Sequence, residues 1–321
     1  QEFTSMAYVS RSKDMINSGD GLRHVFTWII EGKLAQSPLP SIYELENIIP
    51  KTFTGMISLT NWGETPAWLS HKVRSIGLEY LHLPTPDHYP VELIDLIRAV
   101  FFIKRHVERG GSVIVHCMGG VGRSGMVTVA FLISTGKNLY EALRYVRSKV
   151  PGSVENTWQH RMLENFELFI NNVGLTMMQK YLDTLLNSIR EENEVRHVFK
   201  TIQMVIELYN WLSPSTTSIL DELKNAMLHV HDDHISKKLE NIVNPSDKPS
   251  ILVDVAHSLD YKLDSRVVTT DLVENDKKTI LLLCRDFCED IVRETSRSYE
   301  NISGYFENKI RFSWDDFMNY V

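Results

Sequence analysis

Short apolar runs alternate with longer amphipathic segments in the first half of the chain. Strand-like runs lie at 26–30, 33–35, 56–59, 79–83 and 113–115, and the first two predict an edge hairpin. Apolar residues with helical spacing mark segments at 41–49, 91–107, 123–134, 139–149 and 157–171. Because strands alternate with helices, the pattern predicts an α/β fold, with a mainly parallel sheet flanked by helices and 113–115 as its central strand.

The pattern changes to helical periods after Gly174. Helices are expected around 181–189, 195–209, 219–227 and 250–259, followed by strands at 267–273 and 279–284, a helix at 286–306 and a strand at 309–312. A turn at Glu274-Asn275-Asp276 joins the first two of these strands. The order predicts a mostly helical domain that ends in β-β-α-β. We therefore expect domains at 6–174 and 175–321, preceded by a cloning remnant at 1–5.

Composition narrows the class of protein. Of 321 residues, 43% are apolar, and no apolar run approaches the roughly 20 residues that span a bilayer. Three cysteines are too few for a disulfide framework, so we expect a reducing, cytoplasmic setting. The first 174 residues hold 17 basic and 16 acidic side chains, which leaves 17 basic and 25 acidic for the rest. This balance disfavours nucleic acid or an anionic membrane as a partner.

The segment from residue 113 to 125 joins an apolar strand, a cysteine, a glycine-rich loop and an arginine that opens a helix. Glycines let successive backbone N–H groups point at one small anion, and the helix adds the positive end of its dipole. The same groups stabilise a thiolate at Cys117. Arg123, six positions further on, can grip two phosphate oxygens with its planar fork. An ordinary strand-to-helix turn needs neither residue, so the segment predicts a nucleophile directed at phosphorus.

This segment resembles the signature His-Cys-x-x-Gly-x-x-Arg-Ser/Thr of the protein-tyrosine phosphatase superfamily. Its fixed positions are filled by His116, Cys117, Gly120, Arg123 and Ser124. Other cysteine loops that bind anions occur in low-molecular-weight phosphatases, arsenate reductases and sulfurtransferases. The first two carry the loop near the N-terminus, whereas an α/β segment precedes it here, which favours the dual-specificity-like branch. The resemblance implies a phosphate cradle made of Met118, Gly119, Gly120, Val121, Gly122 and Arg123.

The resemblance also implies a general acid and a group that positions water. Asp87 lies in the proline-bracketed loop at 82–90 and is the expected acid for the leaving oxygen, although a turn aspartate could also cap the next helix. Gln159 is the expected water-positioning residue, and the alternative is a glutamine on a helix surface. Ser124 would donate a hydrogen bond to the sulfur, and His116 would fix the loop.

Phosphotyrosine, with phosphoserine and phosphothreonine, is the substrate class that the resemblance implies, in a phosphoprotein or phosphopeptide. The cysteine loop contains no lysine, which disfavours phosphoinositides. Neither a cofactor nor a metal is expected. Two alternatives stay open, namely hydrolysis of nucleotides or polyphosphate and a non-catalytic module that binds phosphoproteins.

The second half resembles the C-terminal, HD-type region of exopolyphosphatase and guanosine-pentaphosphate phosphohydrolase proteins. Segments 194–198, 228–230 and 255–260 echo three of its motifs, but Val230 and His257 stand where metal-binding members carry aspartates. At the cluster His229, His231, Asp232, Asp233 and His234 we therefore expect a solvated helix end and no metal site. Cys284 and Cys288 are expected to be two buried thiols. This half is expected to regulate the enzyme or to dock an unknown partner.

Overall fold

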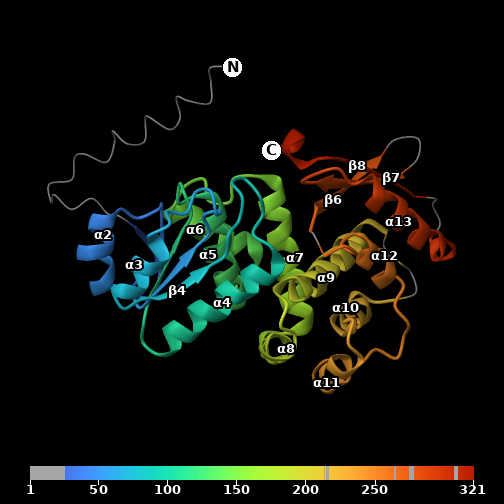
Figure 1. The fold of residues 1–321 in the computed structure, drawn as a ribbon, viewed down its shortest axis with the longest axis horizontal. Coiled ribbons are helices and arrows are strands. Elements are labelled where there is room, and N and C mark those ends of the chain that lie inside the picture. Colours follow the sequence, from blue (N-terminus) through green and yellow to red (C-terminus); the bar gives the residue numbers. More distant parts are fainter. Residues whose placement is uncertain (1–25, 213, 215–216, 264, 275–277, 307–309) are drawn as a thin grey trace.

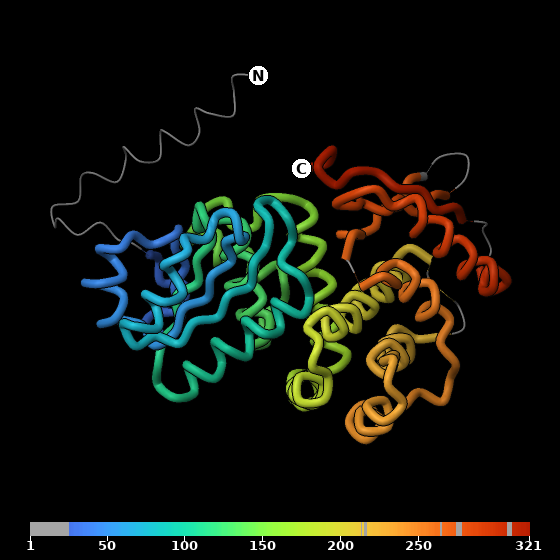
Figure 2. The backbone as a smooth tube through the Cα atoms, in the orientation of Figure 1, coloured from blue at the N-terminus to red at the C-terminus, as the bar shows by residue number. Residues whose placement is uncertain are grey.

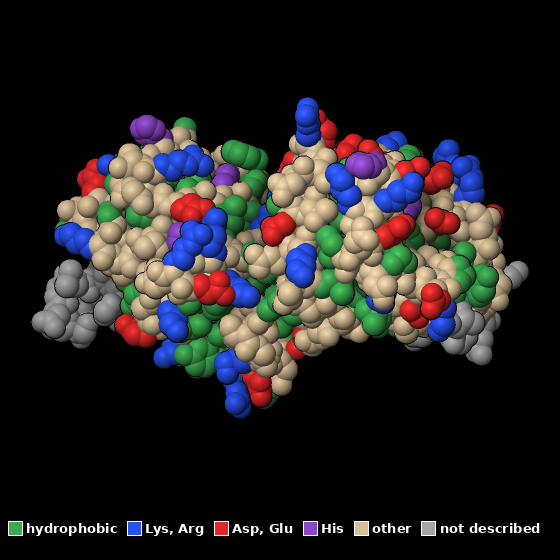
Figure 3. Space-filling view, turned by 90° about the horizontal axis from the view of Figure 1, so that it is seen from below, with side chains coloured by type: hydrophobic (Ala, Val, Ile, Leu, Met, Phe, Trp, Pro, Cys, Tyr) green, Lys and Arg blue, Asp and Glu red, His purple; other side chains and the backbone are tan. Residues whose placement is uncertain are grey.

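The computed structural model describes residues 26–212, 214, 217–263, 265–274, 278–306 and 310–321, so the expected cloning remnant lies outside the described residues. Figure 1 shows two lobes, with the first sheet and its helices at one end and the last strands at the other. Figure 3 shows acidic and basic side chains interspersed over both lobes on one face. Within the described part of the chain, no helix combines the length and the apolar character that crossing a membrane requires.

The first sheet has five strands in the order β1-β2-β5-β3-β4. Their bounds are β1 Thr27–Ile30, β2 Leu34–Ser37, β3 Gly55–Ser58, β4 Glu79–His82 and β5 Val113–His116. β1 pairs antiparallel with β2, and every other pairing is parallel, which confirms the expected sheet with β5 at its centre. The hairpin is an edge only at β1, because β2 also hydrogen-bonds to β5.

Helices cover both faces of this sheet. They are α2 Ile42–Asn47, α3 Leu69–Ser75, α4 Leu93–Glu108, α5 Gly122–Ser134, α6 Leu139–Lys149 and α7 Thr157–Val173. Met56 and Ile114 point to the face that α2 and α3 cover, whereas Ile57 and Val113 point to the face beneath α4 and α5. The strands are apolar throughout because successive side chains enter different cores.

The second half is mostly helical and ends in the expected β-β-α-β order. Its elements are α8 Leu175–Ser188, α9 Glu192–Leu212, α10 Ile219–Leu228, α11 Asp233–Val243, α12 Val253–Ser258, β6 Val267–Glu274, β7 Lys278–Cys284, α13 Glu289–Glu300 and β8 Arg311–Asp316. β7 is central, antiparallel to β6 and parallel to β8. Two short 3-10 helices, η2 Ser303–Tyr305 and η3 Phe317–Tyr320, follow α13 and β8.

Some expected bounds in this half were wrong. The helix expected at 286–306 is shorter, because Cys288 occupies its N-cap position and the chain turns into η2 around Gly304. The last strand begins at Arg311 and runs on to Asp316, beyond the expected bound at 312. The turn expected at 274–276 falls largely outside the described residues, since 275–277 are not described.

The two halves share one continuous apolar core. The largest buried cluster includes Val129 of α5, Phe166 of α7, Tyr181 of α8 and Ala256 of α12. Figure 2 shows the tube passing from α7 into α8 and α9, and α9 contacts α4 and α7 on one side and α10 and α12 on the other. A boundary at Gly174, which ends α7 with φ of 80°, stays a prediction.

Candidate active site

The cysteine loop lies at the carboxyl end of the central strand. β5 ends at His116, and α5 begins at Gly122, so Cys117 opens a short loop at the edge where parallel sheets bind ligands. The Cys117 sulfur is buried and accepts a hydrogen bond from the backbone N–H of Gly120 at 3.2 Å. The Ser124 hydroxyl lies 3.4 Å from the same sulfur. Both contacts stabilise negative charge on sulfur.

Contacts with β2 fix the shape of the loop. Gly120 has φ of 70°, and a Cβ there would lie 2.3 Å from the backbone nitrogen of Pro38. Buried Gln36 donates its side-chain amide to the Gly120 carbonyl at 2.9 Å and accepts a hydrogen bond from Thr128 at 2.9 Å. The conformation and the close approach therefore both require glycine at position 120.

Arg123 lies buried under the loop, and its guanidinium is held by a carboxylate. Its Nη1 and Nη2 lie 2.6 and 3.1 Å from the two carboxylate oxygens of Glu64, and Nη1 also donates to the Thr85 carbonyl at 2.7 Å. Burial works against the charged form, but the hydrogen bond with Glu64 and the nearby Cys117 and Asp87 raise the pKa of Arg123. The guanidinium is therefore charged and is held in one orientation by Glu64 and Thr85.

Asp87 reaches the same guanidinium from the loop after β4. Its Oδ1 lies 2.9 Å from Arg123 Nη2, while its side chain is 56% exposed. His88, which has φ of 64°, lies beside it with Nε2 3.6 Å from Asp87 Oδ2. Asp87 is thus within reach of an oxygen on any phosphate that Arg123 binds. The structure does not use it as the cap of α4, because the N-cap residue of that helix is Glu92.

Gln159 lies buried in the first turn of α7, beside the loop. Its Oε1 accepts the backbone N–H of Glu155 at 2.8 Å, and among the described residues its side-chain Nε2 has no hydrogen-bond partner. That nitrogen would lie 3.1 Å from a Cβ placed on Gly122. An amide donor without a protein partner, beside the cysteine loop, is suited to hold a water molecule.

Glu155 and Glu64 are site residues that the sequence analysis missed. A carboxylate oxygen of Glu155 would lie 1.9 Å from a Cβ at Gly122, so Glu155 packs directly against the loop. Its pKa is raised by burial and by the nearby negative charge of Asp87. Neither glutamate belongs to a recognisable motif, and Glu64 lies 59 positions from the arginine that it contacts.

The remaining predicted residues fall into two groups. His116 is fully buried, with Nδ1 3.2 Å from the Cys117 carbonyl, and burial lowers its pKa to about 4, so it packs as a neutral ring. Met118 and Gly119 are exposed, and Val121 is half-buried, so they form the rim of the loop.

The C-terminal segment packs against the acid-bearing loop, which is the loop at 82–90 that carries Asp87. Phe317 of η3 is fully buried, with its ring centroid 4.6 Å from that of Tyr89 and 5.9 Å from that of Trp158. The Arg285 guanidinium lies over the Tyr89 ring at 5.2 Å. Tyr89 follows Asp87 closely, and Trp158 precedes Gln159, so residues of the second half support both parts of the site.

The chain is similar to known phosphatases over its first half. Residues 46–168 match the family model described as dual specificity phosphatase, catalytic domain. Identity to the dual specificity protein phosphatase Mpk3 of Drosophila melanogaster is 36% over 102 residues, covering 31% of this chain and 25% of that protein. Identity to dual specificity protein phosphatase 1 of Arabidopsis thaliana is 41% over 69 residues, covering 21% of this chain and 35% of that protein.

One solved structure is also similar to part of this chain. The structure of Tk-PTP in its active form is 35% identical in sequence, and the match covers 46% of this chain and 99% of that chain with a TM-score of 0.43. By contrast, the chain spans only about a quarter to a third of the length of the two curated relatives. The family match contains Asp87, the cysteine loop and Gln159, and it ends at residue 168.

Proposed function

Because residues 46–168 form a dual specificity phosphatase catalytic domain of the protein-tyrosine phosphatase superfamily, we propose that this chain is a cysteine-dependent protein phosphatase. The proposed reaction is hydrolysis of phosphotyrosine, with phosphoserine and phosphothreonine as further substrates. The observation that carries the proposal is the convergence of Cys117, Arg123 and Asp87. The sulfur accepts a loop N–H, and the arginine at the other end of that loop contacts the carboxylate.

In the first step the Cys117 thiolate attacks phosphorus, so that an S–P bond forms while the bond from phosphorus to the leaving oxygen breaks. Loop N–H groups and the Arg123 guanidinium stabilise the charge on the remaining phosphate oxygens. Asp87 gives its proton to the departing oxygen, which leaves as a hydroxyl group. The product of this step is a cysteinyl-phosphate.

In the second step a water molecule attacks phosphorus and the S–P bond breaks. Asp87, now a carboxylate, takes the proton of that water, and the free Nε2 of Gln159 supports its position. Ser124 donates its hydroxyl proton in a hydrogen bond to the leaving thiolate, 3.4 Å away. Release of inorganic phosphate returns the enzyme to its starting state.

Phosphoprotein substrates follow from the family, while the choice among residues is part of the proposal. We assign residues 175–321 a regulatory or substrate-docking role, supported by the packing of Phe317 on Tyr89 of the acid-bearing loop. A cytoplasmic location is supported by the free, buried thiols of all three cysteines, which suit a reducing compartment.

Initial rates with a phosphotyrosine peptide test the mechanism. We expect Cys117→Ser to abolish turnover, and Asp87→Asn to lower kcat by about 10²–10⁴-fold. The loss in Asp87→Asn should be smaller with p-nitrophenyl phosphate, because its leaving group needs less help from an acid. Asp183→Asn, at an exposed aspartate of α8, is the matched control and should keep the wild-type rate.

Four outcomes would overturn the proposal. Turnover by Cys117→Ser at the wild-type rate would show that Cys117 is not the nucleophile. An equal loss of kcat in Asp87→Asn with both substrates would show that Asp87 is not the general acid. Faster hydrolysis of nucleotides or polyphosphate than of phosphopeptides would show that these compounds, and not phosphoproteins, are the substrates. Binding of phosphopeptides without any hydrolysis would make the chain a recognition module.

A further inference from the structure

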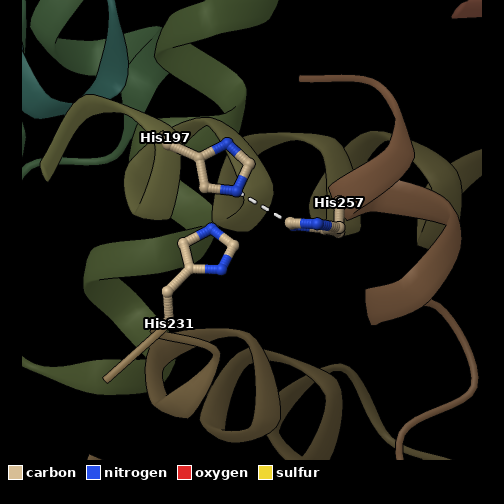
Figure 4. A group of neighbouring side chains, drawn as sticks. All are labelled: His197, His231 and His257. Atoms are coloured by element: carbon tan, nitrogen blue, oxygen red, sulfur yellow. Dashed lines mark hydrogen bonds between the residues drawn. The ribbon is translucent and has the colours of Figure 1, made fainter. Parts of the chain in front are cut away.

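Three imidazole rings converge in the second half, far along the chain from the cysteine loop. One nitrogen each of His197, His231 and His257 lies within 4.8 Å of the others, and Nε2 of His197 is 2.9 Å from Nδ1 of His257. Figure 4 shows the rings turned toward one another across a small space. They come from α9, from the connection between α10 and α11, and from α12. Such convergence is not expected of a solvated helix end.

A carboxylate orients the most buried of these rings. Asp260, 1% exposed, places Oδ2 3.2 Å from Nδ1 of His197, which is itself 1% exposed. When Nδ1–H donates to this carboxylate, Nε2 of His197 carries the lone pair and faces the other two rings. Histidine ligands of metals commonly have such an outer carboxylate, which fixes the tautomer and makes the ligating nitrogen more basic.

The spacing of the three nitrogens, all within 4.8 Å of one another, is close to that of ligands around one ion. Ligands around a tetrahedral ion with bonds of about 2.0–2.1 Å are roughly 3.3 Å apart, so small rotations of the side chains would close the set. Imidazole ligands suit zinc, copper and nickel, whereas calcium and magnesium prefer oxygen.

We propose that His197, His231 and His257 form a binding site for a divalent transition-metal ion such as Zn²⁺, with Asp260 as the outer carboxylate that orients His197. His197 is buried, His257 is half-buried and His231 is exposed, so the site opens to solvent on the His231 side. Three protein ligands with one open side leave a coordination position for water or a small anion. The ion would also link α9 to α12 and to the segment before α11.

His231 is the residue that distinguishes this site from the motif echoes in the sequence. The three motif segments contain His197, His229 and His257 but not His231, and the ring of His229 lies 4.6 Å from that of His257. His231 instead stacks on His197, with centroids 5.4 Å apart and planes inclined by 17°. Asp232, the next residue, caps α11 by accepting the N–H groups of His234 and Ile235. That cap holds the connection in place and leaves the His231 side chain directed at the cluster.

Binding of Co²⁺, followed by visible absorption, tests the proposal without an activity assay. The full chain is stripped with a chelator and titrated, and we expect one equivalent of Co²⁺ with the d–d bands of a four- or five-coordinate site. Zn²⁺ should displace it. The titration is repeated in Cys117→Ser, since a thiolate ligand would reveal itself by a sulfur-to-cobalt charge-transfer band that this variant lacks.

Variants then locate the site. We expect His231→Ala and His257→Ala to weaken Co²⁺ binding by more than about 100-fold, and Asp260→Asn by about 10–100-fold. His234→Ala, three positions from His231 and exposed, is the matched control and should bind as the wild type does. Far-ultraviolet circular dichroism without metal verifies that each variant is folded, and the exposed position of His231 makes that variant the decisive one. Absence of a stoichiometric site, or unchanged binding by folded His231→Ala, would overturn the proposal.

Discussion

At the scale of single residues, the cysteine loop depends on a glycine that no other residue can replace. Gly120→Ala would put a Cβ 2.3 Å from the Pro38 nitrogen, and backbone atoms there cannot yield cheaply. We expect the loop to be displaced and kcat for p-nitrophenyl phosphate to fall by at least about 100-fold, because a nucleophile misplaced by about 1 Å costs that much. Gly32→Ala is the control, since φ there is 66° but no atom of the described residues lies within 4 Å of the added Cβ. Similar rates in the two variants would contradict this reading.

His116 makes stability depend on pH. Its folded-state pKa of about 4 lies below the ordinary value of 6.5, so protonation disfavours the folded state. This contribution is fully present above pH 6.5 and is lost as the pH falls toward 4, amounting to about 2 kcal/mol between pH 7 and pH 5. Urea unfolding should show a smaller drop in His116→Gln than in the wild type. An equal drop in both proteins would show that His116 titrates normally when folded.

At the scale of elements, η3 packs against the acid-bearing loop, although more than 200 residues of chain separate the two. Phe317→Ala would remove the ring that packs between Tyr89 and Trp158, and we expect a loss of about 3–5 kcal/mol in the free energy of unfolding. The folded fraction should also show a larger fall in kcat for a phosphotyrosine peptide than for p-nitrophenyl phosphate, because the proposed acid Asp87 would act mainly on the poorer leaving group. Met318→Ala, exposed and adjacent, should change neither quantity. A lower free energy of unfolding with no selective loss of kcat for the peptide would show that η3 stabilises the fold but does not position the acid-bearing loop.

The sequence analysis missed two helices, α3 and α11. One has too few apolar residues to show a helical repeat, and the other is preceded by a more conspicuous pattern. α3 buries only Leu69 and Val73, and its N-terminus has no side-chain cap. Two apolar residues four positions apart are too few to reveal a helical repeat in the sequence. α11 buries Ile235, Leu239 and Val243 at regular spacing, but the cluster of histidines and aspartates before it concealed the capping role of Asp232. Long apolar segments such as 123–134 were predicted to within a residue or two.

The same contrast holds for the site. The signature puts Cys117 and Arg123 at the two ends of one short loop, so the sequence alone predicts that they are neighbours, while their catalytic roles stay predictions. The contacts of Glu64 with Arg123, and of His231 with His197, join residues that only the folded core brings together. Local spacing carries no information on such pairs, since long-range packing decides them.

At the scale of the whole molecule, a network of charges joins the two halves next to the acid-bearing loop. Arg196 of α9 contacts Glu92 at 3.0 Å and Asp95 at 2.9 Å, both at the start of α4. Asp95 is 2% exposed, and burial raises its pKa, so its charge depends on that arginine. Arg285 also contacts Glu92, at 3.3 Å. The second half thus fixes the helix that directly follows Asp87.

Because this network and one continuous apolar core span Gly174, we expect the full chain to unfold in a single cooperative transition by calorimetry. Arg196→Met would remove the nearest cation from buried Asp95, which would keep only Arg98 at 3.7 Å, and should lower the free energy of unfolding by about 3–5 kcal/mol. Arg297→Met, at a side chain that is 67% exposed, is the control and should change it by less than about 0.5 kcal/mol. Two separate transitions, with only one shifted by Arg196→Met, would mean that the halves are thermodynamically independent. A single shifted transition would instead mean that any ligand of the second half also stabilises the proposed active site, since both belong to one cooperative unit.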